Sequence, residues 1–443
     1  MRSIMHSVRR RLHHLWLSLA LLPGLVSAHA LEIHGSNTIG AALAPMLMTG
    51  FLQQLTGNTV SAQPTGVANE TILSTTHDGK PLTVLVAAHG SSTGFTALAA
   101  NQADIWAASR RVKDSESAAM SARADMTSPA SEHVIAIDGL AILVHPSNPV
   151  ERLDIDTLAR IFAGEISNWA AVGGPDRPIH IYARDEQSGT WDTFKELVLA
   201  GRYSLTSSAR RYESNDALSS DVSSDPSGIG FAGFASAGNS KLVAIADGTA
   251  PALKPSKLSV ATEDYPLARR LYLYTAADTG KPLAQQFIEY VQSQAGQAIV
   301  AESGFFSQTP FAVDLPPDAS VPDTFKRLTQ HYQRLSVNLR FAEGHTQLDN
   351  KALRDLQRVQ QYLADTGRTG RDLMLIGFAD QQNHELRAQM ISELRALSAA
   401  KALREMDVQV QGYVGYGHYM PVGSAGGESG ARRNGRVELW VRR

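Results

Sequence analysis

Apolar residues recur along the chain in two patterns, one with the period of a strand and one with the period of a helix. Strand-like runs cover residues 31–33, 134–144 and 179–182. Helical spacing follows the first run and again the third, where the apolar positions are Trp191, Phe194, Leu197 and Val198. This alternation of strands and helices predicts an α/β layered domain over residues 31–308.

A second unit with its own pattern begins at about Leu335. Its predicted elements are strands over 336–341, 373–378, 408–414 and 436–441, and helices over 350–363 and 386–406. Strands and helices of this number and length predict a small α+β domain, which we assign to residues 330–443.

The segment between the two units, residues 309–329, is rich in proline, with Pro310, Pro316, Pro317 and Pro322. Proline fixes φ and removes a backbone donor, so this density prevents a helix and stiffens the chain. We therefore predict an interdomain linker over residues 309–329.

The first thirty residues have the layout of an export signal. Residues 9–11 are all arginine, an apolar run covers residues 15–26, and Ala28-His29-Ala30 supplies a small-x-small cleavage pattern. The apolar run is shorter than the about 18 residues that a membrane anchor needs. We predict a signal peptide over residues 1–30, cleaved near Ala30. The mature chain is then expected in the periplasm, without a transmembrane segment.

Composition narrows the chemistry. The chain has no cysteine, which excludes disulfides, thiolate metal sites and cysteine nucleophiles. Its formal net charge of −2 gives no reason to expect nucleic acid as a partner. Of the 14 histidines, those outside the leader show no pair at the helical spacing of metal ligands. We expect no metal and no cofactor.

Three clusters of small and hydroxyl residues follow predicted strands, at residues 35–39, 90–94 and 184–190. Unpaired N–H groups at a helix start attract anions, and serine and threonine hydroxyls add donors without bulk. Arg184, in the third cluster, supplies a planar fork that matches a tetrahedral oxyanion. Each cluster alone is also typical of ordinary caps and turns. Three of them in one α/β domain favour an oxyanion site.

The motifs of this domain occur in a consistent order: Asp138-Gly139, Ser147-Asn148-Pro149-Val150, Ile161-Phe162-Ala163-Gly164-Glu165-Ile166-Ser167-Asn168-Trp169, Gly173-Gly174, Arg184 with Ser188-Gly189-Thr190, Ser227-Gly228-Ile229-Gly230-Phe231, Leu271-Tyr272-Leu273-Tyr274 and Gln294-Ala295-Gly296-Gln297. With them, the stretch from Gly35 to Phe306 resembles the phosphate-binding proteins of ABC importers. The resemblance implies a periplasmic-binding-protein fold, in which two α/β lobes joined by a hinge close on a dehydrated oxyanion.

The resemblance also implies the residues that bind phosphate. Carried over position by position, they are Thr38, the backbone of Ile39, Ser91, Ser109, Arg184, Ser188, Gly189 and Thr190. Glu186 lies where the family often has an acid that braces the arginine.

One of these positions departs from the family pattern. Well-studied members carry an aspartate that accepts the proton of monohydrogen phosphate, and here that place falls on Ser109, followed by Arg110. A hydroxyl can donate or accept, whereas a carboxylate only accepts and repels a fully ionised dianion such as sulfate. Asp138, at the predicted crossing between the lobes, is a candidate substitute proton acceptor and equally a candidate hinge residue.

The C-terminal unit resembles the OmpA-like peptidoglycan-binding domain. The resemblance rests on these motifs: Val337-x-Leu339-x-Phe341, Gly377-Phe378-Ala379-Asp380, Ile391-Ser392-x-x-Arg395-Ala396, Gly415-Tyr416-Gly417 and Asn434-Gly435-Arg436-Val437-Glu438. It implies that Asp380 and Arg395 grip the zwitterionic end of diaminopimelate, with Asp380 at the ammonium and Arg395 at the carboxylate. By spacing alone the two residues are also typical of a surface ion pair. Ala379 and Ala388 depart from the family pattern.

Three functions remain open from the sequence. The first is a periplasmic binding protein for phosphate or a related oxyanion, working with an ABC permease and tethered to peptidoglycan at the cell wall or outer membrane. The second is a wall-bound oxyanion sensor or surface protein without a transport role. The third is an enzyme such as a phosphatase, since residues 90–94 match G-x-S-x-G with Ser92 as nucleophile. No further motif marks a triad, so we expect a binding protein rather than an enzyme.

Overall fold

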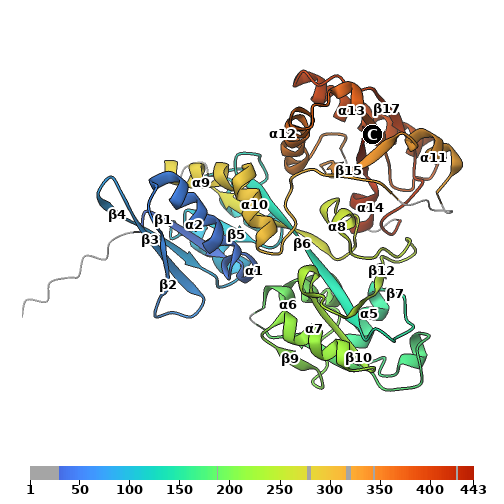
Figure 1. The fold of residues 1–443 in the computed structure, drawn as a ribbon, viewed down its shortest axis with the longest axis horizontal. Helices are drawn as coiled ribbons and strands as arrows, with labels where there is room; N and C mark the ends of the chain where they lie inside the picture. The colour runs from blue at the N-terminus through green and yellow to red at the C-terminus, as the bar shows by residue number, and fades with distance from the viewer. Residues whose placement is uncertain (1–28, 187, 277–280, 316–320, 343–344, 426–427) are drawn as a thin grey trace, which may run out of the picture.

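The described chain forms three bodies, two α/β lobes and a C-terminal domain that lies beside both (Figure 1). The computed structural model describes residues 29–186, 188–276, 281–315, 321–342, 345–425 and 428–443. The predicted signal peptide, apart from its last two residues, lies outside this part of the chain, as do Pro316 and Pro317 of the predicted linker.

The first lobe is a mixed sheet with helices packed against it. Its strands run in the order β2-β3-β4-β1-β5, followed by two long strands shared with the hinge. They are β1 (Leu31–Gly35), β2 (Ser61–Pro64), β3 (Glu70–His77), β4 (Lys80–Ala87) and β5 (Ile105–Ala108). The helices are α1 (Asn37–Gly40), α2 (Leu43–Thr56), α3 (Ser91–Ala99), α4 (Asp114–Met120), α9 (Pro282–Gln292) and α10 (Gln294–Glu302).

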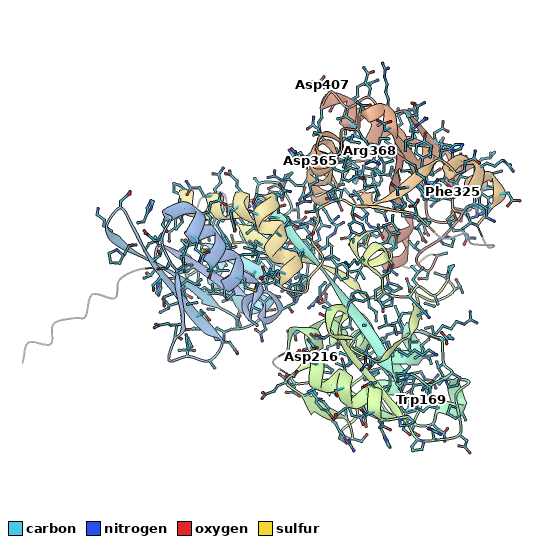
Figure 2. All side chains as sticks on the ribbon, viewed as in Figure 1. Trp169, Asp216, Phe325, Asp365, Arg368 and Asp407 are labelled. Atoms are coloured by element: carbon cyan, nitrogen blue, oxygen red, sulfur yellow. The ribbon has the colours of Figure 1, made fainter. Side chains whose placement is uncertain are left out.

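The second lobe has a smaller sheet. Its strands are β7 (Arg152–Asp154), β8 (His180–Arg184), β9 (Arg210–Tyr212), β10 (Gly228–Gly233), β11 (Lys241–Leu242) and β12 (Ala244–Ala246). Its helices are α5 (Ile155–Phe162), α6 (Gly189–Phe194) and α7 (Asn215–Ser224). The predicted helix with Trp191, Phe194, Leu197 and Val198 on one face is α6 followed by a π-helical turn over Lys195–Leu199. Trp169, labelled in this lobe in Figure 2, is fully buried in the core.

Two stretches of chain connect the lobes and form the hinge. The long strand β6 (Glu132–Val144) pairs with β13 (Ala268–Thr275) through its first part and with β10 through its second part. The return connection runs through the short helix α8 (Lys257–Ala261) into β13. Asp138 and Arg269 are paired across these two strands at the crossing.

The C-terminal domain is a five-stranded sheet in the order β14-β15-β18-β16-β17. The strands are β14 (Ala312–Val313), β15 (Tyr332–Arg340), β16 (Leu373–Gly377), β17 (Gly412–Gly415) and β18 (Arg436–Arg442), and the helices are α11 (Asp323–Thr329), α12 (Asn350–Asp365), α13 (Glu385–Glu405) and α14 (Glu428–Asn434). Alternate residues of β16 pack into two apolar clusters, one on each face of the sheet. Leu373 and Leu375 face α12 and α13, while Met374 and Ile376 pack with Phe325 of α11 (Figure 2).

The predicted fold class, two α/β lobes with a hinge followed by a small α+β domain, is confirmed. The segment predicted as a linker differs from an extended connection. Its β14 pairs with β15, and the Phe325 ring of α11 lies 5.6 Å from that of Trp440. The number of prolines in a segment does not indicate whether its other residues bury apolar side chains, as Phe325 does here. The division of the chain at residues 308 and 329 stays a prediction.

The C-terminal domain is docked on the hinge through a network of buried charges. Arg270 of β13 donates to both oxygens of Glu263, at 2.5 and 2.8 Å, and to Asp349 at 2.8 Å. Arg340 donates to Glu263 and Asp264, at 3.2 and 3.1 Å. Burial disfavours the charge of Glu263, but the surrounding cations outweigh it and lower the pKa of this carboxyl to about 2.

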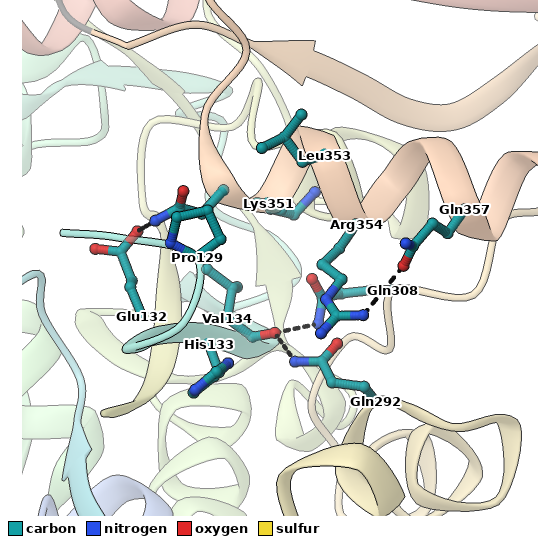
Figure 3. A pocket seen from close by; sticks show the side chains of 11 residues that line it. Pro129, Glu132, His133, Val134, Gln292, Gln308, Lys351, Leu353, Arg354 and Gln357 are labelled. Atoms are coloured by element: carbon teal, nitrogen blue, oxygen red, sulfur yellow. Dashed lines mark hydrogen bonds between the residues drawn. The ribbon is translucent and has the colours of Figure 1, made fainter. Parts of the chain in front are cut away.

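The same domain contacts both lobes. On the first lobe, Asn350 of α12 donates to Glu132 at 3.1 Å, beside a cavity of about 270 Å³ that His133, Gln292 and Gln308 help to line (Figure 3). On the second lobe, the guanidinium of Arg433 pairs with Asp247. The C-terminal domain therefore bridges the hinge. Among the helices that the structure describes, none has the length and apolar character needed to cross a bilayer.

Candidate functional site

Three parallel strands of the first lobe end side by side and bring their following residues together. Strand β1 lies between β4 and β5 and is parallel to both, so the carboxyl ends of all three meet at one edge of the sheet. Thr38 follows β1, Ser91 follows β4 and Ser109 follows β5. Gly35 permits the tight turn, because a Cβ at this position would lie 2.0 Å from the carbonyl oxygen of Ala107.

Ser91 and Ser109 are direct neighbours at this edge. The backbone N–H of Ser109 donates to Ser91 Oγ at 3.1 Å, and the two hydroxyl oxygens lie 3.2 Å apart. The Ser109 side chain is buried, and its successor Arg110 forms a bidentate ion pair with Glu116 at 2.7 and 2.8 Å. Ser91 and Ser109 thus form a neutral pair of hydroxyls at this edge.

Arg184 is the corresponding feature of the second lobe. It ends β8 and is buried, and its guanidinium donates to the carbonyl oxygens of Tyr212 and Glu213 at 3.0 and 2.5 Å. Its Nη1 reaches Thr190 Oγ1 at 3.5 Å. Burial lowers the pKa of Arg184, while Asp185 opposes that change. The two carbonyls hold the guanidinium in place at the start of α6.

The Ser-Gly-Thr turn presents its hydroxyls beside this arginine. Ser188 caps α6, and its Oγ accepts from the N–H groups of Thr190 and Trp191 at 3.2 and 3.4 Å. A hydroxyl that accepts from protein donors keeps its own proton for another acceptor. Ser188 and Thr190 are therefore set as donors.

The two lobes touch where Gly189 meets Thr38. A Cβ built on Gly189 would lie 2.1 Å from Thr38 Oγ1 and 2.4 Å from Thr38 Cα. Only glycine permits this approach, so the turns that hold Thr38 and Gly189 lie directly against each other in this structure. The side chain of Ile39 is fully buried in the core, which leaves only its backbone to face the cleft.

Arg269 lies in this site, and the sequence analysis did not single it out. Its Nη2 donates to Thr38 Oγ1 and to the carbonyl oxygen of Gly189, both at 3.0 Å. Its Nε pairs with Asp138 Oδ2 at 3.3 Å, and the same oxygen accepts from Thr193 Oγ1 at 3.1 Å. The structure thus makes Asp138 the counter-ion of Arg269. A role for Asp138 as proton acceptor stays a prediction.

The surroundings of Glu186 and Ser92 differ from those expected from the sequence. Glu186 does not lie against Arg184; it is exposed and pairs with Arg211 at 3.3 Å. Ser92, the would-be nucleophile, accepts from Arg110 Nη2 at 3.3 Å at an exposed helix start. Within the described ranges, no group of three or more histidine, aspartate or glutamate residues is placed to hold a metal ion. The arrangement can bind an anion through hydroxyls and guanidinium groups.

The C-terminal domain holds a second candidate site. Asp380 follows β16, and its Oδ1 accepts from Asn434 Nδ2 at 2.9 Å. Arg395 extends from α13, where its Nη1 donates to the carbonyl oxygen of Phe378 at 3.2 Å and its Cζ lies 5.2 Å from the ring centre of Phe341. Burial lowers the pKa of Arg395, and the Asp380 carboxylate opposes that change.

Glycine shapes this second site as well. A Cβ at Gly435 would lie 2.6 Å from Arg395 Nη1, so a side chain at this position would displace the guanidinium. The next residue, Arg436, points away from the site. It stacks on Phe378 at 4.0 Å and pairs with Glu438 at 3.0 Å.

Comparison with known families agrees with both parts of the fold. Residues 49–295 match the PBP superfamily domain, and residues 340–435 match the OmpA family. The first match covers more than half of the chain, so the protein belongs to the PBP superfamily, and it carries an OmpA-family domain at its C-terminal end.

Individual relatives lie within the first match. The chain is 31% identical to the phosphate-binding protein PstS of Bacillus subtilis (strain 168) over 185 residues, which are 41% of this chain and 59% of the relative. It is 32% identical to Protein SphX of Synechococcus elongatus over 241 residues, which are 51% of this chain and 69% of the relative. The chain therefore spans less than two thirds of the Bacillus protein.

A solved structure shares the fold. The crystal structure of a possible phosphate binding protein from Planctomyces limnophilus DSM 3776 superimposes with a TM-score of 0.51 at 24% identity. The match covers 68% of this chain and 95% of that chain. At this identity it supports the two-lobed fold alone.

Proposed function

We propose that this protein is a periplasmic receptor for phosphate or a related tetrahedral oxyanion, held at the cell wall by its OmpA-like domain. The observation that carries the proposal is the contact between the lobes at Thr38 and Gly189, with hydroxyl donors and the buried guanidinium of Arg184 in the adjoining turns. Thr38 and Ser91 come from the first lobe, and Arg184, Ser188 and Thr190 come from the second.

The donors are suited to an anion stripped of water. Ser91 accepts from the N–H of Ser109, Ser188 from two N–H groups, and Thr190 from Arg184. The protons of Ser188 and Thr190, and one of the two hydroxyl protons of the Ser91–Ser109 pair, are then left for the ligand. Hydrogen bonds to a charged group are worth about 1.5–3 kcal/mol each. Several such bonds with one guanidinium can offset the cost of dehydrating a dianion.

The choice of phosphate among oxyanions comes from relatives such as the Bacillus subtilis protein, whose name describes it as phosphate-binding. The same kinship supports a role as the binding component of an ABC importer, with a permease as partner. A sensor or surface protein that has kept the lobes uses the same site without a permease.

The OmpA-like domain supports the tether. Asp380 and Arg395 lie close enough for their charges to interact, and they present one charge of each sign, which is the complement of the ammonium and carboxylate of diaminopimelate. Attachment to peptidoglycan places the receptor at the cell wall or on the inner side of the outer membrane.

Calorimetric titration of residues 31–443 with phosphate, sulfate, molybdate and tungstate tests the proposal. We expect saturable one-to-one binding of phosphate and of at least one further tetrahedral anion. Chloride and acetate serve as controls for non-specific anion binding. Absence of binding to all four oxyanions would contradict the proposed function.

A further inference from the structure

Arg269 is a buried arginine at the hinge whose bonding is incomplete. Its side chain is 6% exposed, and its Nη1 makes no hydrogen bond to any described residue. The acid nearest to this nitrogen is Glu196, whose Oε2 lies 3.8 Å away. A buried guanidinium donor without a partner is costly, so such a group points to a ligand or to a conformational role.

Asp138 contacts only one side of the Arg269 guanidinium. The carboxylate lies at the Nε side, at 3.3 Å, while Nη2 faces Thr38 and Gly189. The pair is formally neutral, but its positive end is directed to the place where the two lobes meet. The positive end of the pair therefore lies at the contact between Thr38 and Gly189.

The contact with Thr38 decides what that hydroxyl can do. A threonine hydroxyl carries one proton and two lone pairs. Because Arg269 can only donate, Thr38 Oγ1 accepts from it at 3.0 Å, and the threonine proton is free to point elsewhere. Without Arg269, Thr38 could equally donate to the nearby protein and present a lone pair to the anion.

The contact with Gly189 makes the arginine a link between the lobes. Thr38 belongs to the first lobe and Gly189 to the second, and Nη2 bonds to both. These contacts form only when the lobes approach, so they favour the closed arrangement. Arg269 sits on β13, one of the two connections that the hinge must bend.

We propose that Arg269 is a positioning residue of the oxyanion site: it fixes the Thr38 hydroxyl as a donor and fastens the closed lobes, with Asp138 as its counter-ion. This inference rests on the proposed function, and it adds a residue from the hinge to the ligands carried over from the family. Its effect on the anion passes through Thr38 and through closure.

A double-mutant cycle tests the inference. Phosphate affinity is measured by calorimetry for the wild type, Arg269→Gln, Thr38→Val and the double variant. We expect each single change to weaken binding roughly tenfold to a hundredfold, the loss of one or two charge-assisted hydrogen bonds. If Arg269 acts through Thr38, the losses should not add up. The phosphate affinity of the double variant should then lie within about threefold of the affinity of the single variant that binds phosphate less tightly.

Two further variants separate this role from general stability. Arg269→Lys keeps the charge but loses the fork, so we expect partial recovery relative to Arg269→Gln. Arg270→Gln changes the next residue, which faces the C-terminal domain; it should lower the melting temperature yet leave phosphate affinity unchanged.

The outcomes are distinguishable. A wild type that binds phosphate and an Arg269→Gln variant that binds it equally well would overturn this inference and leave the proposed function standing. Fully multiplicative losses in the double variant would also overturn it. A wild type that binds no tetrahedral oxyanion would overturn the proposed function and this inference together.

Discussion

Arg269 and Arg270 are consecutive residues of β13, and their guanidinium groups bind in two different sites. Arg269 contacts Thr38 and Gly189 in the cleft, whereas Arg270 pairs with Glu263 and with Asp349 of the C-terminal domain. Side chains alternate across a strand, so one hinge strand serves both the cleft and the interdomain contact. The C-terminal domain is therefore part of the hinge environment rather than a distant tether.

The buried network around Glu263 predicts a pH dependence of stability. The pKa of Glu263 is about 2 in the folded protein, against an ordinary value of 4.5. A depressed folded pKa means that the contribution, about 3 kcal/mol, is present above pH 4.5 and is lost as pH falls toward 2. We expect Glu263→Gln to remove this part of the acid dependence of thermal unfolding. The exposed Glu186→Gln should leave the profile unchanged, and equal profiles for wild type and Glu263→Gln would refute the role of the network.

Arg184→Ala should lower phosphate affinity by at least about a hundredfold. The guanidinium is buried beside the Ser-Gly-Thr turn, and its loss removes a charged donor from a dehydrated site. The melting temperature should also fall by a few degrees, because the carbonyls of Tyr212 and Glu213 lose their donor. The matched control is Arg210→Ala, an exposed arginine of β9 that rests on the Tyr182 ring. Calorimetry that finds equal affinity for both variants would remove Arg184 from the site.

Local patterns in the sequence were enough to predict a few elements of the lobes and the main elements of the C-terminal domain. The apolar run over 134–144 is β6, and the helical pattern over 350–363 is α12. The bounds of β17 and the presence of β14 were not predicted, because both depend on pairing with strands distant in the sequence. The strand expected near 408–414 is confined to Gly412–Gly415, because only these residues pair with β16. Residues 312–313 become a strand because β15 offers an edge to pair with.

The cleft was predictable only where a short motif marks it. Thr38, Ser91 and Arg184 stand in strand-to-helix turns that the resemblance identifies, and the structure places Thr38 against Gly189 of the turn that follows Arg184. Arg269 stands in no such motif, since its role depends on a strand register that pairs it with Asp138, 131 residues away. Glu263 and Arg340 look like surface charges in a sequence, because their burial comes from the docking of one domain on another.

Ser109→Asp should sharpen selection against sulfate. A carboxylate at this buried position would lie beside Ser91, where it accepts a proton that phosphate carries and sulfate lacks. Repulsion of a fully ionised dianion should widen the ratio of phosphate to sulfate affinity by more than about tenfold. Competition titrations at fixed pH measure this ratio, with Ser109→Asn as the neutral control. A wild type that already ignores sulfate would show that another residue provides the discrimination.

Asp138→Asn should change affinity and stability in opposite directions. Without the carboxylate, the charge of Arg269 is no longer balanced, so an anion in the cleft is bound several-fold more tightly. The buried guanidinium then lacks its counter-ion, and unfolding should cost about 3 kcal/mol less. Titration and thermal unfolding of the same preparations check both signs. If phosphate affinity falls while sulfate affinity does not, Asp138 is the proton acceptor instead of a counter-ion.

Both Asp380→Asn and Arg395→Ala should lose binding to peptidoglycan. Each side chain faces one charge of the zwitterionic ligand, so removal of either leaves the opposite charge of the ligand unpaired. Arg395 Nε is buried and has no hydrogen-bond partner among the described residues, which leaves this guanidinium incompletely satisfied without a ligand. Pull-down with purified sacculi, comparing wild type and the two variants at equal concentration, measures the loss, which should exceed about tenfold.

The control for this experiment lies on the same helix as Arg395. Arg404→Ala removes an exposed arginine at the other end of α13 and should leave retention unchanged. Point variants are preferable to a truncation near Pro317, because removing the domain would expose Glu263 and Arg270 without their partner residues Arg340 and Asp349. All variants should still bind phosphate, since Asp380 and Arg395 bond to Asn434 and Phe378 of their own domain. Retention of both site variants equal to that of Arg404→Ala would leave the C-terminal domain as a scaffold for the hinge alone.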